Sequence, residues 1–166
     1  MRSTYDERNF VRAYELCSYL DGDPLDHLLD IHSVLVKDTL DQHLYGFRDT
    51  PVQLVEVTGK KVLKVIPVMN FLVEIKRLSQ EKRKFNGLDQ VAFEHIELLK
   101  IHPFHDGNGR LARFITCKRL ADMEAKYFYR YLEKKSDEHI QAISDVFYNG
   151  KGLKAFADFL KRIAVF

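Results

Sequence analysis

The sequence predicts a mainly α-helical domain that is interrupted by one β-hairpin. Apolar residues recur at helical spacing over most of the chain, and Pro and Gly steps separate the periodic stretches. One short segment differs, because β-branched and long side chains dominate it on both sides of Thr58-Gly59. Such a segment is typical of two strands joined by a tight turn.

The composition predicts one domain of ordinary globular character. The chain has 166 residues, of which 46% are apolar and 30% charged, so it can bury a core without metal or disulfide staples. The formal net charge of +2 is spread along the chain and gives no footprint for nucleic acid. Cys17 and Cys117 form no CxxC pair, so we predict neither a disulfide framework nor a structural zinc site.

The location predicted from composition is cytoplasmic. No run approaches the roughly 18 apolar residues of a membrane helix, so we predict no membrane contact. The N-terminus MRSTYDERNFVR is too charged for a cleaved signal peptide. Delivery into another cell as a translocated effector stays open, since a non-cleaved signal would leave no trace in this pattern.

Periodicity and turn residues define the elements of the N-terminal half. A first helix contains Phe10, Tyr14 and Cys17 and ends at the turn Asp21-Gly22-Asp23-Pro24. The patterns then predict a helix over Leu25 to Leu40, with Leu28, Leu29, Leu35 and Val36 on its apolar stripe, a hairpin over Pro51 to Val65, and a helix over Pro67 to about Lys84 with Val68, Phe71, Leu72, Ile75 and Leu78 on one face.

Four further helices are expected in the C-terminal half. Asp89 is the expected N-cap of a central helix that runs to His102, where Pro103 ends it. The remaining patterns predict a helix over Arg110 to Met123 with Leu111, Phe114, Cys117 and Leu120 inward, a helix capped by Ser136, and, after Gly150 and Gly152, a last helix carrying Leu153, Phe156, Leu160 and Ile163.

The stretch between the central helix and the next one carries the features of a phosphate site. The helix that follows begins with Arg110 and Arg113 in its first turn, where two cations oppose the macrodipole. An anion at that helix start would offset their charge, and Gly107 and Gly109 allow backbone amides to close around phosphate oxygens. The sequence therefore predicts a phosphate-binding nest.

Two side chains beside this nest suit catalysis at a phosphate. Asp106 offers a hard oxygen ligand for Mg²⁺ shared with substrate phosphates. His102 has an ordinary pKa near ~6.5, which suits a general base at neutral pH. Together these residues predict attack by a hydroxyl on a nucleotide phosphate, with Mg²⁺ as the metal.

The stretch from His102 to Arg113, HPFHDGNGRLAR, resembles the signature HPFx(D/E)GNGRxxR of the Fic (filamentation induced by cAMP) family at every fixed position. The upstream hairpin and the Gly46-x-Arg48 step before it are similar to that family's layout. The resemblance covers about residues 25–123 and implies a single Fic-type helical domain over 1–166, with flanking helices in 1–24 and 124–166.

The resemblance implies a protein adenylyltransferase, which transfers AMP from ATP to a Tyr, Thr or Ser hydroxyl of a target protein and releases pyrophosphate. It assigns the base to His102 and the metal ligand to Asp106, and makes Phe104 a core anchor. The phosphate-binding residues implied by it are Gly107, Asn108, Gly109, Arg110 and Arg113.

The resemblance implies that the hairpin is a flap, on which in this family a target segment pairs as an added strand. The docking residues that this implies are Pro51, Val52, Gln53, Leu54, Val55, Val62 and Leu63. A second interpretation is that the hairpin only covers the core. The Fic resemblance also leaves open a homo-oligomer and an antitoxin-like inhibitor protein.

An N-terminal motif suggests self-restraint. Many Fic proteins carry (S/T)xxxE(G/N), whose glutamate pairs with the second signature arginine. Ser3 and Glu7 match its first and fifth positions, but Arg8 stands where Gly or Asn is expected. Restraint by Glu7 and restraint by a separate partner are both retained as hypotheses.

Other interpretations of the site remain beside this one. The same phosphate nest could transfer UMP, phosphocholine or phosphate, or the domain could be a nucleotide-binding regulatory module without transfer. A zinc cluster of His102, His105 and Asp106 is disfavoured because Pro103 separates the histidines. We expect His105 to be an exposed filler, His32 to be structural, and Lys82-Arg83-Lys84 to be a solvated helix end.

Overall fold

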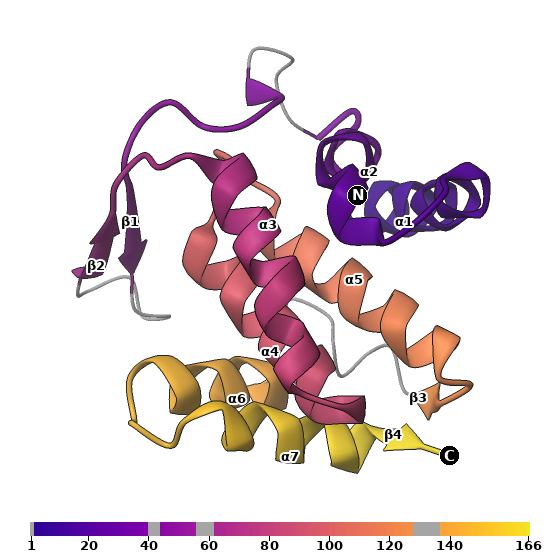
Figure 1. Cartoon of the computed structure of the whole chain (residues 1–166). Coiled ribbons are helices and arrows are strands. Elements are labelled where there is room, and N and C mark those ends of the chain that lie inside the picture. Colours follow the sequence, from indigo (N-terminus) through magenta and orange to yellow (C-terminus); the bar gives the residue numbers. More distant parts are fainter. Residues whose placement is uncertain (1, 40–43, 56–61, 128–136) are drawn as a thin grey trace. The chain divides into compact units, whose positions relative to one another are not determined.

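A computed structural model of the chain describes residues 2–39, 44–55, 62–127 and 137–166, and it is mainly helical, as predicted (Figure 1). The chain divides into two compact units. Unit 1 comprises Met1–Arg77 and Lys100–Asn108, and unit 2 comprises Leu78–Leu99 and Gly109–Phe166. The domain boundaries expected from the sequence stay a prediction.

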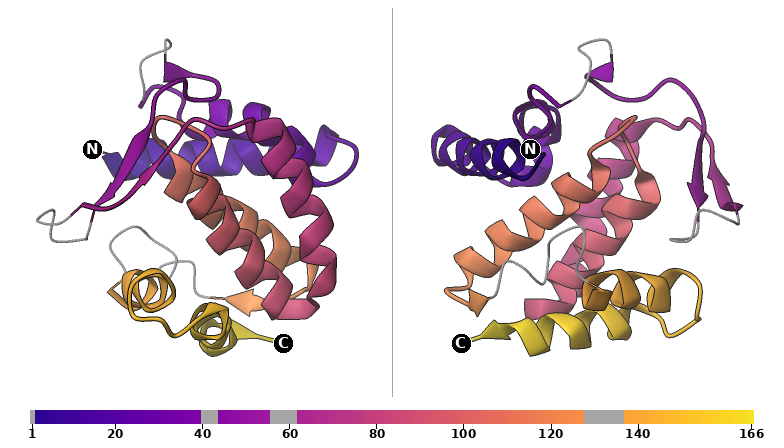
Figure 2. Two further views of the ribbon diagram at one scale, coloured as in Figure 1. Left: turned by 60° about the vertical axis from the view of Figure 1, so that its left-hand side comes forward. Right: turned by 180° about the vertical axis from the view of Figure 1, so that it is seen from behind.

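Unit 1 begins with a pair of packed helices, α1 (Arg2–Tyr19) and α2 (Leu28–Leu35), which lie side by side in both Figure 1 and Figure 2. The 3-10 helix η1 (Pro24–His27) precedes α2. The buried Nδ2 of Asn9 donates to the carbonyl of Lys37 at 2.7 Å and to that of Leu35 at 3.4 Å. Asn9 thus satisfies carbonyls at the end of α2, where helices lack intrahelical partners.

The second helix is shorter than its apolar stripe predicts. Its α-helical part ends at Leu35, not at Leu40, which lies outside the described residues. Asp38 has a left-handed φ of 63°, which no helix continues through. Leu29 is 42% exposed and does not belong to the buried stripe.

The predicted hairpin is confirmed. Strand β1 (Val52–Val55) pairs antiparallel with β2 (Val62–Ile66), and Val52 stands opposite Ile66. The register shifts between Leu54 and Val55. The predicted turn at Thr58-Gly59 lies outside the described residues.

Helix α3 (Phe71–Glu81) starts four residues after Pro67, where the sequence pattern had placed its beginning. Asn70 Oδ1 accepts the Val73 N–H at 3.3 Å and so acts at the true start. Val68 and Leu72 are 45% and 66% exposed, whereas their predicted partners Phe71, Ile75 and Leu78 are buried. The apolar face is therefore narrower than predicted.

A 3-10 turn, η3 (Lys82–Lys84), follows α3, and of the three residues predicted to be a solvated helix end, Arg83 and Lys84 are exposed but Lys82 is not. Lys82 is buried and forms a 3.2 Å ion pair with Glu94. The other carboxylate oxygen of Glu94 accepts from Arg119 at 2.9 Å. Burial of one acid between two bases keeps the group compensated inside unit 2.

The remaining helices follow the predicted order: α4 (Gly87–Ile101), α5 (Asn108–Asp122), α6 (Asp137–Phe147) and α7 (Leu153–Ile163). Asp89 lies inside α4 and is not its N-cap. Within unit 2, α6 packs along α7 (Figure 1). The inward positions predicted for α5 and most of those predicted for α7 are confirmed as buried, namely Leu111, Phe114, Cys117, Leu120, Phe156, Leu160 and Ile163.

A second small sheet escaped the sequence analysis. Strand β3 (Lys126–Tyr127) pairs antiparallel with β4 (Ala164–Val165), which directly follows α7. Strands of two residues carry no alternating pattern, so periodicity could not reveal them. Ser136, the expected cap of α6, lies outside the described residues.

Candidate functional site

The signature begins where α4 ends. His102 follows Ile101, the last residue of α4, and takes a left-handed φ of 49°. The main-chain N–H of Arg48 donates to the Pro103 carbonyl at 2.9 Å, and its side-chain Nε donates to the His102 carbonyl at 2.6 Å. The His-Pro step predicted to end the helix does so, and a residue from before the hairpin holds its backbone.

Phe104 anchors the loop that follows. It is fully buried, as the resemblance implied. The ring of His32 stacks on it with centroids 3.7 Å apart and planes 4° apart, and Phe47 lies 5.5 Å away on a tilted plane. His32 is fully buried and structural, as expected.

His32 also reaches the motif's backbone. Its Nε2 lies 2.7 Å from the carbonyl oxygen of Asp106, and a carbonyl only accepts. Nε2 therefore carries the proton in this tautomer. The sequence offered no local signal for this contact, because 74 positions separate the two residues.

Asn108 closes the loop from its other end. Its Oδ1 accepts the Phe104 N–H at 3.1 Å, and its Nδ2 donates to the Phe104 carbonyl at 2.8 Å. Both bonds are buried, and the side chain is 3% exposed. The side-chain amide of Asn108 is therefore occupied in shaping the loop.

Gly107 must be glycine for two reasons. Its φ is 84°, a region that other residues rarely adopt, and a Cβ there would lie 2.6 Å from Val36 Cγ1 and 3.0 Å from His32 Nε2. The close approach of α2 to the motif backbone depends on the absence of a side chain at this position.

Asp106 is exposed at the tip of this loop. Its Oδ1 accepts the N–H of Gly107 at 2.6 Å. An accessible carboxylate on a fixed loop fits a Mg²⁺ ion, which protein sites commonly hold through one or two carboxylates together with substrate phosphates. Among the residues that the structure describes, no three His, Cys, Asp or Glu side chains gather as a metal site of their own.

The arginines of the motif belong to unit 2, in the first turns of α5, which starts at Asn108. A Cβ on Gly109 would lie 3.3 Å from Nη1 of Arg113, so this guanidinium group lies close over the glycine. Arg110 is half-buried on the same helix. Positive charge is thus concentrated at the positive end of a helix dipole, as predicted.

A buried histidine pair lies within the electrostatic reach of Arg113. Nε2 of His139 is 3.3 Å from Nε2 of His95, whose Nδ1 bonds the Thr116 hydroxyl at 2.8 Å. Burial, with the charge of Arg113 acting in the same direction, lowers the pKa of His139 to about 3. Burial, His139 and Arg113 also lower the pKa of His95 well below its usual value. Both rings are neutral at pH 7, and sequence analysis missed this pair.

His105 is more enclosed than we expected. Its side chain is 22% exposed, and Nε2 lies 3.4 Å from Oδ1 of the exposed Asp49. It is therefore a partly buried surface residue and not an exposed filler.

The other predicted site residues lie outside the signature. Of the flap residues, Pro51 precedes β1, Val52 to Val55 form it, and Val62 and Leu63 open β2. Ser3 and Glu7 lie on α1, where Glu7 is exposed. Their roles in docking and restraint stay predictions.

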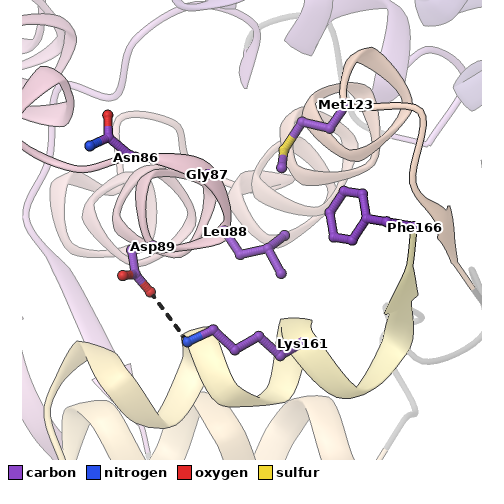
Figure 3. A pocket seen from close by; sticks show the side chains of 7 residues that line it. All are labelled: Asn86, Gly87, Leu88, Asp89, Met123, Lys161 and Phe166. Carbon is purple, nitrogen blue, oxygen red and sulfur yellow. Dashed lines mark ion pairs between the residues drawn. The ribbon is translucent and has the colours of Figure 1, made fainter.

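A surface pocket lies elsewhere, in unit 2, between the start of α4, Met123, Lys161 and Phe166 (Figure 3). An ion pair of 3.8 Å joins Asp89 to Lys161 on its wall. No residue of the signature lines it. Within the described ranges, no helix combines the length and the apolar character that crossing a membrane requires.

Comparison with known proteins agrees with the signature. The model of the Fic/DOC family matches residues 19–120. No curated protein sequence matches the chain significantly.

Three solved structures are similar in fold. A Fic family protein from Desulfovibrio desulfuricans G20 has a TM-score of 0.69 at 21% identity, over 92% of this chain and 48% of that chain. This chain therefore spans about half of that protein. The N-terminal Fic domain of a VirB-translocated Bep effector from Bartonella quintana has a TM-score of 0.67 at 19% identity, over 98% of this chain and 80% of that chain. BepC from Bartonella tribocorum, with bound AMPPNP, has a TM-score of 0.59 at 17% identity, over 96% of this chain and 84% of that chain.

Proposed function

We propose that this chain, which belongs to the Fic/DOC family, transfers AMP from ATP to a Tyr, Thr or Ser hydroxyl of another protein and releases pyrophosphate. The observation that carries the proposal is the way in which the signature is held. Hydrogen bonds from Arg48, His32 and Asn108 fix the backbone between His102 and the start of α5. A rigid loop between a base and a helix N-terminus suits phosphate chemistry.

His102 is the proposed general base. Its imidazole takes the proton of the target hydroxyl as that oxygen attacks the α-phosphorus of ATP. The new oxygen–phosphorus bond joins AMP to the protein, and the bond between the α-phosphorus and the bridging oxygen breaks. Pyrophosphate leaves with the electron pair of that bond, and the proton on His102 passes to solvent.

The start of α5 is the proposed phosphate site. The main-chain N–H groups of Gly107, Asn108 and Gly109 would bind the α- and β-phosphates, and Arg110 and Arg113 would offset the charge of the outer phosphates. Asp106 would hold Mg²⁺, which supplies further charge neutralisation when bound. The AMPPNP in the structurally similar BepC supports ATP as the donor.

The flap is the proposed docking edge. Strands β1 and β2 form a two-stranded sheet, so each has one edge available in principle for pairing with an extended segment. The main-chain pairing of a target segment with this edge would fix the position of its hydroxyl. Such pairing would require little of the target's side-chain sequence.

Labelled ATP tests the proposal. The chain is incubated with Mg²⁺ and ATP labelled at the α- or the γ-phosphate, with and without cell lysate. Protein-bound label from the α position alone is expected. Label from γ would replace the proposal by phosphate transfer, and the absence of label with intact nucleotide binding would replace it by a regulatory module.

Two histidine variants provide the matched controls. We expect His102→Ala to abolish transfer while ATP affinity stays within about threefold, because the base is not a phosphate ligand. His105→Ala, three residues away on the same loop, should retain transfer. Transfer by His102→Ala would refute the assigned base. Competition with UTP and CDP-choline then tests the alternative donors.

A further inference from the structure

Among the residues of unit 1 that the structure describes, Arg48 is the largest buried charged side chain. It is 2% exposed and lies between the first helices and the flap, in the segment that leads into β1. Its guanidinium carbon lies 4.8 Å from the centre of the Phe71 ring, a distance at which cation and ring attract each other. Burial lowers the pKa of Arg48, yet a guanidinium group stays protonated in proteins.

The side chain of Arg48 bonds three parts of the backbone at once. Nε donates to the His102 carbonyl at 2.6 Å, and Nη1 donates to that of Thr50 at 2.7 Å. Nη1 also donates to the Ile66 carbonyl at 3.4 Å, and Nη2 donates to that of Pro67 at 3.0 Å. Thr50 and Pro67 flank the flap strands β1 and β2 on either side. One planar fork therefore joins both ends of the flap to the residue proposed as the base.

His102 needs such a restraint. Its φ of 49° is a left-handed conformation that is unfavourable for a non-glycine residue, and surrounding contacts must maintain it. The two contacts from Arg48, to the carbonyls of His102 and Pro103, act on this residue and its neighbour. The direction of the imidazole follows from the backbone conformation that they hold.

We propose that Arg48 is a positioning residue: it holds His102 in its left-handed conformation and couples that conformation to the two ends of the flap. When a target strand pairs with the flap, the imidazole of His102 would already be oriented for catalysis. This inference rests on the proposed function for its kinetic consequence, while the link between Arg48 and His102 stands on geometry alone.

The main test is Arg48→Lys, which keeps the charge but has one ammonium group in place of a fork that donates in several directions. Its matched control is Arg77→Lys on α3, which makes the same substitution at a more exposed position. The side chain of Arg77 is 40% exposed, and its Nε forms an ion pair with Glu74 at 2.9 Å. For each variant, transfer of α-labelled AMP is measured per folded molecule, together with the Kd for ATP. We expect kcat to fall at least tenfold in Arg48→Lys, with the Kd for ATP within threefold of the parent, and neither to change in Arg77→Lys.

A second measurement is independent of transfer. The imidazole carbon-13 signals are recorded by NMR, and that of His102 is identified by its loss in His102→Ala. We expect this signal to shift and broaden in Arg48→Lys but not in Arg77→Lys. If Arg48→Lys does not fold, Phe71→Leu, which removes the ring beside the guanidinium group, is measured instead, and a smaller change in the same direction is expected.

The outcomes separate the two proposals. Unchanged kcat per folded molecule together with an unchanged His102 signal overturns the positioning role. A changed His102 signal in a protein whose parent transfers no AMP supports the role of Arg48 and refutes the proposed function. A lowered melting temperature with the parent's kcat and the parent's imidazole signal shows that Arg48 is only structural.

Discussion

The ring of His32 lies flat on the ring of Phe104, with centroids 3.7 Å apart, while its Nε2 bonds the carbonyl of Asp106 at 2.7 Å. A histidine of α2 thus fixes both the buried anchor and the exposed end of the loop. The position of Asp106 depends on a residue that contributes no chemistry of its own.

His32→Phe would keep a stacking ring but remove the donor to Asp106. Loss of this part-buried hydrogen bond should cost about 0.5–1.5 kcal/mol, and the loop that carries Asp106 would lose its support. We expect a lower melting temperature and a higher Mg²⁺ concentration for half-maximal ATP binding, measured by calorimetry and titration. His27→Phe, at a ring that bonds the Asp21 carbonyl, is the control and should leave the Mg²⁺ dependence unchanged. An equal Mg²⁺ requirement in both variants would contradict the role of His32.

Gly107→Ala would test how closely α2 approaches the signature. The new Cβ would lie 2.6 Å from Val36 Cγ1, and the alanine would have to adopt a φ of 84°. Overpacking and backbone strain together should lower the free energy of unfolding by about 2–5 kcal/mol. Gly150 has a φ of 65° but nothing within 4 Å of an added Cβ. Gly150→Ala should therefore cost only the conformational part, about 1–2 kcal/mol. Urea unfolding of the two variants measures the difference. Equal losses in the free energy of unfolding would show that Val36 moves aside at no energetic cost.

Asn108→Ala would remove both bonds to the Phe104 backbone. The buried main-chain N–H and carbonyl of Phe104 would then lose their bonds to this side chain. We therefore expect a loss of about 2–4 kcal/mol in the free energy of unfolding. ATP affinity should fall as well, because the loop before α5 loses its shape. Asn149→Ala removes an exposed amide that bonds Asp145 at 2.7 Å and should cost less than about 1 kcal/mol. A loss in Asn108→Ala as small as that in the control would rule out the bracing role.

Acid should destabilise the protein through His139. Its pKa is about 3 in the folded chain against 6.5 as the ordinary value, so the unfolded chain binds more protons between these limits. The free energy of unfolding therefore falls as pH is lowered below 6.5, by roughly 2 kcal/mol for this residue alone at pH 5. His95, whose pKa is also lowered, acts in the same direction.

The control for this pH dependence is His139→Phe, which removes the titrating group and keeps an aromatic ring beside Phe156 and Phe159. Thermal melts at pH 7 and pH 5 should show a smaller difference for this variant than for the parent. The same difference in both proteins would place the acid sensitivity elsewhere.

Local sequence signals accounted for most of the helices, the hairpin and the order of the signature. Pro103 ends α4 and the apolar spacing of Leu111, Phe114 and Leu120 reports a buried face, because these effects act between near neighbours in the chain. The same signals did not separate buried from exposed apolar positions on α2 and α3. Leu72 and Leu29 are exposed although their spacing fits a stripe, since burial depends on what packs against a helix.

The sequence by itself determined the chemistry offered by the signature: a histidine before proline, a carboxylate, glycines and two arginines at a helix start. Only the tertiary structure decided what holds these groups. Arg48 and Lys82 carry no local pattern that marks them as buried, and their partners are 54 and 12 positions away. The apolar neighbours of His32 do indicate a core position, but its partner Asp106 is 74 positions away. A hydrogen bond between distant residues depends on the folded path of the chain, which no local pattern contains.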